Sequence, residues 1–213
     1  MIRIEKAEVF NFEGALRGMR NPMNSHHKSD SYFNLDGYLL RNEPEYKLGE
    51  NDLDLCKRLI KGGTEHRKFL RQIMVCVDIT APLYFWKEFD TYKVGTTANS
   101  TSTMHKIHSK PFDLEDFSHD KLHGISLNAL LRIVDDLEAF RKLYLETKDK
   151  EIWYQIIQLL PSSYHQTRTV TMTYENLLAM HHQRRHHKLD EWHTFCDWVE
   201  KLPYMKEFLS CIV

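Results

Sequence analysis

Several features that would assign a protein to a special class are missing from this sequence. The chain has 213 residues and only four cysteines, which are scattered and form no C-x-x-C pair. This distribution favours reduced thiols over a disulfide framework, and we expect Cys76 to be buried in a strand. The formal charge of −1 gives no electrostatic reason to expect a nucleic-acid or membrane-surface partner. Because no apolar run is long enough to cross a bilayer and MIRIEKAEVF lacks the features of a signal peptide, we expect a cytoplasmic protein.

The motifs of several enzyme classes are also missing. The hydroxyl-rich stretch GTTANSTST at 95–103 is of a kind that can line a phosphate or cofactor pocket, but it lacks the G-x-x-x-x-G-K spacing of a P-loop. Histidines at 181, 182, 186 and 187 include a pair four residues apart, which a helix would place on one face. No glutamate completes an H-E-x-x-H motif. Polar helix surface is therefore the simpler interpretation, and metal binding by the His181–His187 cluster is the alternative.

The apolar pattern changes between strand and helix periods without regular alternation. Residues 72–80 alternate as in a strand, although a helix continuing from His66 is a rival interpretation. Ser126 is placed to cap an amphipathic helix at 126–147, in which we expect five apolar side chains to face inward: Leu130, Leu131, Val134, Leu137 and Phe140. The other predicted elements are strands at 2–10 and 167–173, helices at 52–61, 151–160 and 173–199, and loops at 18–50 and 92–102. This mixture is typical of an α+β fold, and the length suits one domain spanning 1–213.

The segment 173–199 reads as one long helix, or as two helices joined near the histidines. Leu178, Leu189, Trp192 and Val199 fall on one stripe at helical spacing, and Arg185 falls on the same stripe. An arginine on a core-facing stripe needs an anion, because its charge is not shed by deprotonation. That anion is either a carboxylate of the protein or a bound ligand.

Several fragments become more specific when they are read in order. LP at 160–161 precedes the strand QTRTVTMTY, NL follows at 176–177, and Arg185 lies seven residues before Trp192. Upstream, the segment GTEH at 63–66 begins with glycine and ends in Glu-His. This ordered set resembles the flavin-dependent thymidylate synthases, the ThyX family, over most of residues 50–200. The resemblance implies a mixed fold with a central antiparallel sheet flanked by helices.

The chain departs from the family most clearly at 81–103, APLYFWKEFDTYKVGTTANSTST, where the family carries an RHRxxSxNExSxR motif. Counted without a gap, RHR falls on Thr91, Tyr92 and Lys93, and the glutamate falls on Asn99. The second serine and the last arginine fall on Thr101 and Thr103, and a shift of one residue places the serine on Ser102 instead. The motif arginines and glutamate are missing in both registers. Lys93 remains as a nearby cation, but lysine does not reproduce the bidentate geometry of arginine. In the final helix, the positions that hold flavin in the family fall on Tyr174, Asn176 and Met180.

The resemblance implies a reaction in which NADPH reduces FAD and methylenetetrahydrofolate supplies one carbon to dUMP, giving dTMP in a homotetramer. It implies that Arg185 is the catalytic position and contacts the nucleotide. The implied substrate-binding residues are Arg185, Lys93, Thr101, Ser102 and Thr103. The implied cofactor-binding residues are His66, Thr91, Tyr92, Lys93, Asn99 and Asn176.

Two further expectations follow from these residues. The changed flavin positions predict weaker FAD binding than is usual in the family, and slow or absent dTMP formation. The aromatic residues at 83–89, together with Trp192, Phe195 and Trp198, suggest an oligomer in which some of them meet a partner subunit. A flavin- or nucleotide-binding relative that has lost thymidylate synthesis is the alternative function, and a metal-binding or structural protein is the second.

Overall fold

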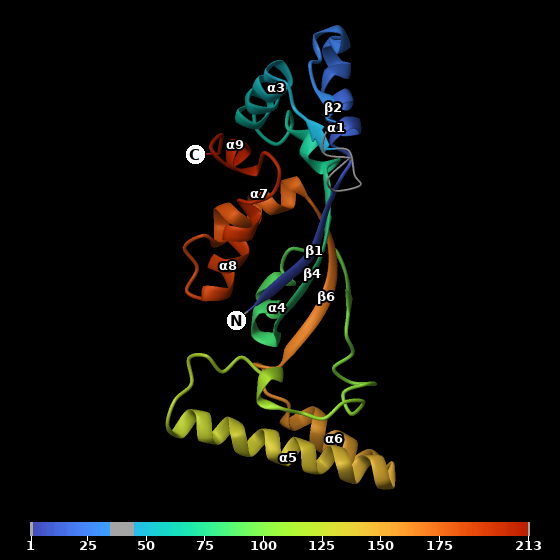
Figure 1. Ribbon diagram of the computed structural model, residues 1–213, viewed down its shortest axis with the longest axis vertical. Helices are drawn as coiled ribbons and strands as arrows, with labels where there is room; N and C mark the ends of the chain where they lie inside the picture. The colour runs from blue at the N-terminus through green and yellow to red at the C-terminus, as the bar shows by residue number, and fades with distance from the viewer. Residues whose placement is uncertain (1, 35–44, 213) are drawn as a thin grey trace.

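An antiparallel sheet runs along the long axis of the molecule (Figure 1). The computed structural model describes residues 2–34 and 45–212. The strand order is β1-β4-β6-β5, and the strands are, in that order, Arg3–Phe10, Met74–Pro82, His165–Thr173 and Thr97–Ser100. Helices cover one face of this sheet and lie at both of its ends. This arrangement confirms the predicted α+β fold with a central antiparallel sheet.

The two central strands confirm the strand predictions at 72–80 and 167–173. They pair in continuous register from Met74 opposite Thr173 to Pro82 opposite His165. In β4, Val75, Val77 and Ile79 are fully buried beneath the helices, as alternation predicts. Cys76 lies on the opposite face and is only half-buried, so the expectation of a buried thiol was wrong. The rival interpretation of this segment as a helix is also wrong.

The helices that cover the sheet carry a large aromatic cluster. α4 (Leu83–Phe89) follows β4 directly, and α7 (Tyr174–Arg184) follows β6 directly. α8 (Asp190–Val199) and α9 (Met205–Leu209) complete this layer. The rings of Phe85 and Trp192 lie 4.7 Å apart, and Phe195 packs edge-on against Trp192 at 5.4 Å. Aromatic side chains supply much of the apolar area that holds α4 and α8 on the sheet.

A second, smaller apolar cluster lies at the other end of the sheet. α5 (Ile125–Thr147) crosses this end and packs against α6 (Lys150–Leu159), which ends before Pro161 (Figure 1). Both helices were predicted, but α5 begins at Ile125 with Gly124 as its N-cap, and the Ser126 hydroxyl bonds to the carbonyl of His123 instead of capping the helix. The residues buried between the two helices include Leu130, Leu137 and Ile156. Leu131 was expected to face inward but is 39% exposed.

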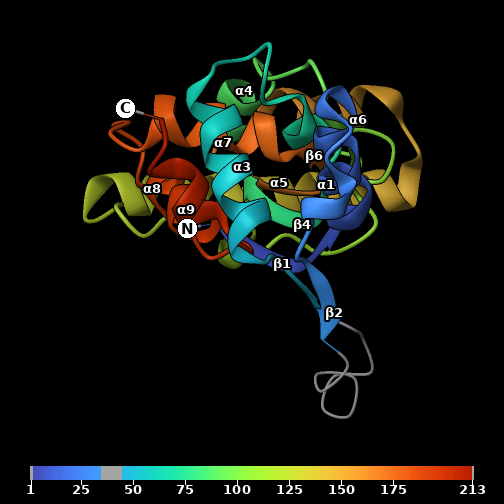
Figure 2. The ribbon, with the colours of Figure 1, turned by 90° about the horizontal axis from the view of Figure 1, so that it is seen from above.

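The N-terminal third is more ordered than the sequence suggests. The interval 18–50 was predicted to be largely loop, yet it contains the end of α1 (Phe12–Arg20) and two 3₁₀ turns, at Asn21–Met23 and His26–Lys28. A short antiparallel pair, β2 (Tyr32–Asn34) and β3 (Glu45–Lys47), follows and extends away from the helices (Figure 2). Positions 35–44 of the expected loop lie outside the described residues. α3 (Glu50–Lys61) confirms the helix predicted at 52–61. The remaining short helical turns are Lys68–Arg71 and Leu114–Asp116.

None of the described helices is both long and apolar enough to span a bilayer.

A buried ion pair holds this N-terminal third together. The Arg20 Nε donates to Asp52 Oδ1 at 2.6 Å, and both side chains are almost completely buried. The other oxygen of Asp52 accepts from the hydroxyls of Ser29 and Ser31 at 2.7 and 2.6 Å. Burial alone would raise the pKa of Asp52, but the hydrogen bonds from Ser31, Ser29 and Arg20 lower it below its ordinary value. This carboxylate therefore ties α1 and the 29–31 segment to α3.

We predict that Asp52→Asn lowers the free energy of unfolding by about 3–5 kcal/mol, because the change leaves a buried guanidinium without its counter-ion. The matched control is Asp54→Asn, since Asp54 forms a 2.9 Å pair with Arg58 in which both side chains are 67% exposed. That control should change stability by less than about 0.5 kcal/mol. Urea denaturation of the three proteins measures both values.

The same pair should give a pH dependence. The pKa of Asp52 is lower in the folded state than in the unfolded chain, so its contribution is present above the unfolded pKa and is lost as the pH falls through the folded pKa. The stability gap between wild type and Asp52→Asn should therefore shrink when urea denaturation is repeated under acid conditions. A gap that stays constant, or an Asp54→Asn loss equal to that of Asp52→Asn, would contradict this account.

Candidate functional site

The last helical segment breaks at the histidines, and this break moves Arg185 off the apolar stripe. α7 ends at Arg184 and α8 begins at Asp190, so the two-helix interpretation was correct. Leu178, Trp192 and Val199 are buried as expected, but Arg185 is exposed. Its guanidinium makes no hydrogen bond or ion pair with any described residue. A buried protein carboxylate as the partner of Arg185 is therefore wrong, and its charge is open to solvent or to a ligand.

The arginine that packs against the core is its neighbour, Arg184. Its Nε donates to the Tyr92 hydroxyl at 2.9 Å, and its guanidinium lies over the rings of Tyr92 and Trp192 at 5.5 and 5.2 Å. A terminal nitrogen pairs with Glu88 Oε2 at 3.3 Å. The guanidinium is thus fixed by two rings, a hydroxyl and a carboxylate, with 19% of the side chain exposed. Sequence reasoning missed this role because it extended one helical stripe through the histidines and chose Arg185, not Arg184, as the arginine that faces the core.

The loop after α4 is attached to α7 at two points. Tyr92 bonds to Gln183 Oε1 at 2.9 Å and to Arg184 near the end of α7. At the start of α7, the amide of Asn176 donates from Nδ2 to the carbonyl of Val94 at 2.7 Å. The Oδ1 of Asn176 also accepts from the Thr173 backbone N–H at 3.2 Å, as part of a capping box. The structure therefore separates two predicted cofactor residues: Tyr92 contacts the end of α7 and Asn176 lies at its start, although both hold the same loop.

A second arginine, Arg168 of β6, was not among the predicted site residues. Its Nη1 and Nη2 bond to the two oxygens of Asp90 at 2.6 and 3.4 Å, and its guanidinium lies over the Trp86 ring at 4.2 Å. Arg168 occupies the same face of β6 as the buried Val170, because strand positions two apart share a face. Strict alternation through QTRTVTMT could have revealed it.

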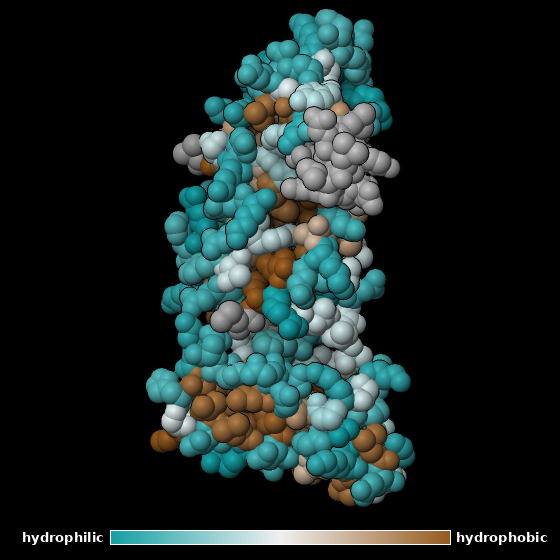
Figure 3. Space-filling model, in the orientation of Figure 1, coloured by the Kyte–Doolittle hydropathy of each residue, from teal (hydrophilic) through white to brown (hydrophobic). Residues whose placement is uncertain are grey.

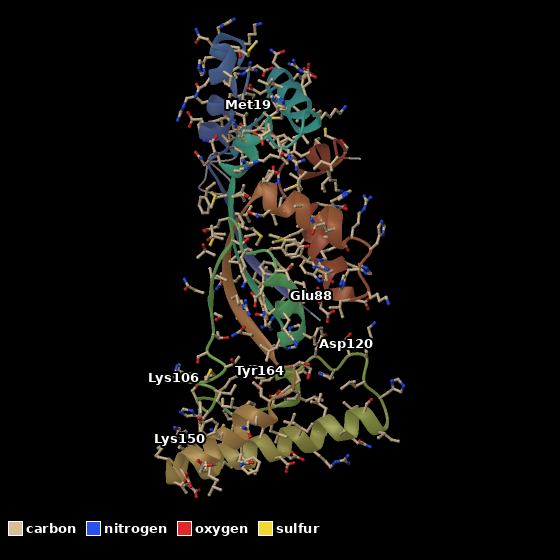
Figure 4. All side chains as sticks on the ribbon, turned by 180° about the vertical axis from the view of Figure 1, so that it is seen from behind. Met19, Glu88, Lys106, Asp120, Lys150 and Tyr164 are labelled. Carbon is tan, nitrogen blue, oxygen red and sulfur yellow. The ribbon has the colours of Figure 1, made fainter. Side chains whose placement is uncertain are left out.

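The two arginines and their carboxylates form one charged cluster around the end of α4. Glu88 lies in its last turn and Asp90 is its C-cap. Each carboxylate neutralises one arginine, and Lys93 is exposed on the adjoining loop. Figure 4 labels Glu88 on this helix. The cluster is therefore preorganised to bind an anion or a polar planar group. Glu88 and Asp90, however, already accept some of the hydrogen bonds that the two guanidinium groups can donate.

The remaining predicted loop residues lie along the sheet edge. Residues 92–102 were expected to be loop, but Thr97–Ser100 form β5 and pair with β6, which places Asn99 opposite Thr169 on an edge strand. Thr101 continues this edge, since its N–H donates to the Thr167 carbonyl at 2.9 Å. The strand forms there because β6 offers an unpaired row of backbone groups.

Three further predicted residues stand apart from the arginine cluster. The Ser102 hydroxyl accepts from the N–H groups of Met104 and His105 at 3.2 and 2.8 Å, and Thr103 is partly buried beside it. Thr91 is exposed, and its hydroxyl donates to the Glu88 carbonyl at 2.7 Å. Among these three, only Thr91 therefore contacts α4 near the cluster.

His66 lies on the turn between α3 and the 68–71 helical turn, where it packs against Gly62. It is exposed. The next residue, Arg67, pairs with Glu175 of α7 at 3.0 Å, with both side chains less than 20% exposed. This ion pair brings the turn to the N-terminal end of α7, the end where Asn176 holds the loop.

The histidine cluster does not converge on a common point. His181 is buried and its Nε2 lies 2.9 Å from Glu200 Oε1. His182 and His186 are exposed on the surface of the α7–α8 junction. Within residues 2–34 and 45–212, no group of three or more histidine, cysteine or acidic side chains is arranged to hold a metal ion.

We predict that Gly95→Ala destabilises the protein through the attached loop. Gly95 has φ of +74°, and a Cβ there would lie 2.8 Å from Asn176 Oδ1. Gly63→Ala is the matched control, because Gly63 has φ of +93° but no atom within 4 Å of the added Cβ. Both changes should cost about 1–2 kcal/mol for the left-handed backbone, and Gly95→Ala should cost measurably more. Equal losses in thermal denaturation would show that the contact with Asn176 is unimportant.

Comparison with known proteins supports this fold at low sequence similarity. No protein-family model and no curated protein matches the chain. Among solved structures, thymidylate synthase X (ThyX) from Helicobacter pylori with FAD and dUMP is 16% identical, with a TM-score of 0.70 over 100% of this chain and 99% of that one. A UMP/dUMP methylase, PolB from Streptomyces cacaoi bound with 5-Br dUMP, is 12% identical, with a TM-score of 0.54 over 84% of this chain and 75% of that one. The chain therefore has the fold of the flavin-dependent thymidylate synthases, in a divergent sequence.

Proposed function

We propose that this protein binds a flavin and a pyrimidine deoxynucleotide and transfers a one-carbon unit between folate and nucleotide, in the manner of dUMP to dTMP conversion. The observation that carries the proposal is full-length similarity to a ThyX structure with FAD and dUMP, combined with the arginine–aromatic cluster at the end of α4. Methylenetetrahydrofolate and NADPH are the proposed co-substrates.

The nucleotide would be held mainly by the arginines. Arg185 is exposed, and Arg184 beside it is fixed on two aromatic rings, so together they offer a dianionic phosphate several charged donors. Lys93 adds a third positive charge from the loop attached to α7. The hydroxyls of Thr101, Ser102 and Thr103 lie farther along the sheet edge. We propose that these residues contribute through a neighbouring subunit or through an extended ligand.

The residues near Asn176 fit a flavin, although the motif arginines of the family are missing. Within the described chain, the Thr96 hydroxyl and the Glu175 Oε2 are buried and have no hydrogen-bond partner. Buried polar atoms without partners are costly, and a bound heterocycle with N–H and carbonyl groups would satisfy them. We propose that FAD lies against Tyr92, Lys93 and Asn176, with His66, Thr91 and Asn99 at the edges of its site.

The contribution of the chain to the reaction is binding and orientation. A bound flavin would supply the hydride. Arg184 and Arg185 hold the nucleotide phosphate, and Tyr92 presents a ring against which a planar group can stack. The aromatic layer beneath them, Phe85, Phe89 and Trp192, keeps water from the floor of the site. Arg185 is the proposed catalytic position because its side chain is exposed and forms no hydrogen bond or ion pair with the described residues, which leaves its charge available to a substrate.

A relative that binds nucleotide or flavin but has lost synthesis is the second candidate. The observation that favours it is the pairing of both cluster arginines with Glu88 and Asp90, which leaves less free charge for a phosphate. The metal-binding or structural alternative has less support, because His181 already bonds to Glu200, His182 and His186 are exposed, and His187 Nδ1 accepts from the Leu189 N–H.

We also propose a homotetramer, but with a subunit interface formed by residues other than the aromatic ones predicted from the sequence. The aromatic side chains expected at an interface are mostly buried in the protein's own core, as Phe85, Trp86, Phe89, Trp192 and Phe195 show. Apolar side chains are exposed instead on α5, over which Figure 3 shows an apolar patch. They are Ile125, Leu131, Leu143 and Leu145, with exposed fractions of 88%, 39%, 41% and 39%. Because residues 125 and 143 lie on one side of this helix and residues 131 and 145 on the other, each side offers two exposed apolar side chains to a partner subunit.

We predict that Arg185→Ala weakens dUMP binding by about 2–5 kcal/mol, as expected for loss of a charge-assisted contact. Because Arg185 is exposed, the melting temperature should not change. Lys188→Ala removes a nearby exposed charge and serves as control. Calorimetric titration with dUMP measures the affinity. Equal affinities for wild type and Arg185→Ala, with dUMP bound by both, would remove Arg185 from the site.

We predict that Glu88→Gln tightens dUMP binding about two- to fivefold, because the partly exposed pair with Arg184, worth about 0.2–1 kcal/mol, would no longer compete with the phosphate. Glu13→Gln, which changes an exposed acid on α1, is the matched control. Weaker binding by Glu88→Gln would mean that the carboxylate contacts the ligand directly.

The activity itself is tested by incubating the protein with dUMP, methylenetetrahydrofolate, FAD and NADPH and measuring dTMP by mass spectrometry. We predict formation far slower than about 1 per second, the lower part of the usual enzyme range, because hydroxyl and amide groups replace the charges of the family motif. Turnover in the usual range would show that other residues compensate. Nucleotide and flavin binding without any dTMP would favour the non-synthase relative.

A further inference from the structure

A separate cavity lies beside the first turn of α4, next to the arginine cluster but distinct from it. Its volume is about 530 Å³, within the range of small-molecule sites. Residues 118–122, the 161–163 turn and the start of α8 form its walls together with Tyr84. Figure 4 labels Asp120 in this region, on the α5 side of Glu88. None of the residues proposed above to bind flavin or nucleotide lines this cavity.

The most unusual group in the cavity wall is the carboxylate of Glu191. Only 8% of the surface of Glu191 is exposed to solvent. It accepts a short hydrogen bond from the Tyr84 hydroxyl, which lies 3.2 Å from Ser118 Oγ. Burial and the contact with Glu191 raise the pKa of Tyr84, so this hydroxyl stays protonated and neutral. A neutral donor compensates only part of the cost of burying a carboxylate.

No described lysine, arginine or histidine forms an ion pair with Glu191. Lys121 is at the rim, where it pairs with Asp190 at 2.9 Å and is 75% exposed. Lys188, the other lysine of the wall, is exposed. The position of Glu191 in the first turn of α8 gives it some support from the helix dipole, but this is a partial charge only. Lys121 also attracts Glu191 through space, but no described cation is in direct contact with this carboxylate.

Besides two further acids, Asp120 and Asp190, and the two lysines, the wall has an uncharged part that a ligand would contact. Ile2, Leu122, Pro161 and Leu189 provide apolar surface, and Ser162, Ser163 and Thr194 provide hydroxyls around it. We propose that this cavity binds a small ligand that carries a cationic nitrogen group, an amidine or amine on a compact apolar body, with the nitrogen donating to Glu191. The inference does not depend on flavin or nucleotide binding, because Arg184, Arg168 and the Tyr92 loop take no part in it.

The test uses benzamidine and benzamide, which have the same shape and differ in charge. Calorimetric titration of the full chain should show benzamidine binding at least about tenfold more tightly than benzamide, a difference of about 1.4 kcal/mol. Glu191→Gln should remove this preference. Tyr84→Phe should keep it, because the carboxylate remains and loses only its neutral donor. Asp190→Asn, at the rim of the cavity, is the control and should bind benzamidine within about twofold of wild type.

The outcomes separate this inference from the proposed function. Equal affinity for the two compounds, no benzamidine binding at about 10 mM, or full binding by a folded Glu191→Gln would overturn the cationic-ligand site. If Glu191→Gln does not fold, Glu191→Asp and the wild-type preference for benzamidine decide. dUMP affinity measured on the same proteins should be unaffected by benzamidine, so failure of nucleotide binding would leave this result standing.

Discussion

The pairing of β4 with β6 is the constraint on which the arrangement of this protein depends. The two strands are antiparallel over nine residue pairs, and each is followed at once by a helix: β4 by α4 and β6 by α7. The helices therefore start at opposite ends of the ladder and cover the same face in opposite directions. This brings the last turn of α4, with Glu88, against the last turn of α7, with Arg184. Residues almost a hundred positions apart therefore meet because the register of β4 with β6 fixes where each following helix begins.

The arginines of the charged cluster are rigidly held, but the groups that hold them also reduce the positive charge that is free to bind a ligand. Arg184 and Arg168 are held by aromatic rings and by Glu88 and Asp90, so little conformational entropy is lost when a ligand binds. The same carboxylates lower the net positive charge that a phosphate would meet. The cluster therefore supplies rigid cations that are partly neutralised by their own carboxylates. This is the physical reason for proposing nucleotide binding together with slow chemistry.

Much of the fold could be predicted from the sequence, because β4, β6, α3, α5 and α6 each carry a strong period and clear end signals. The site was harder to predict. Arg185 was placed on a core stripe by extending one helical period through the histidines, but it is the first of the five residues between α7 and α8, where that period is interrupted. The order of 18–34 depends on a long-range pair between Arg20 and Asp52, which no local pattern reveals. β5 was missed because an edge strand of hydroxyl residues has little apolar alternation and forms only where β6 offers free backbone groups.

The most direct test of the account is a titration of the purified, ligand-free protein with FAD, followed by the visible spectrum and by flavin fluorescence. The account predicts saturable binding that is perturbed by dUMP. It also predicts that binding is weakened by replacing Asn176, at the start of α7, or Tyr92, whose hydroxyl bonds to Gln183 near the end of α7. Binding of dUMP without any FAD binding would restrict the protein to a nucleotide-binding role. No binding of either ligand at high micromolar concentration would contradict the central claim that this fold still holds a flavin beside a pyrimidine nucleotide.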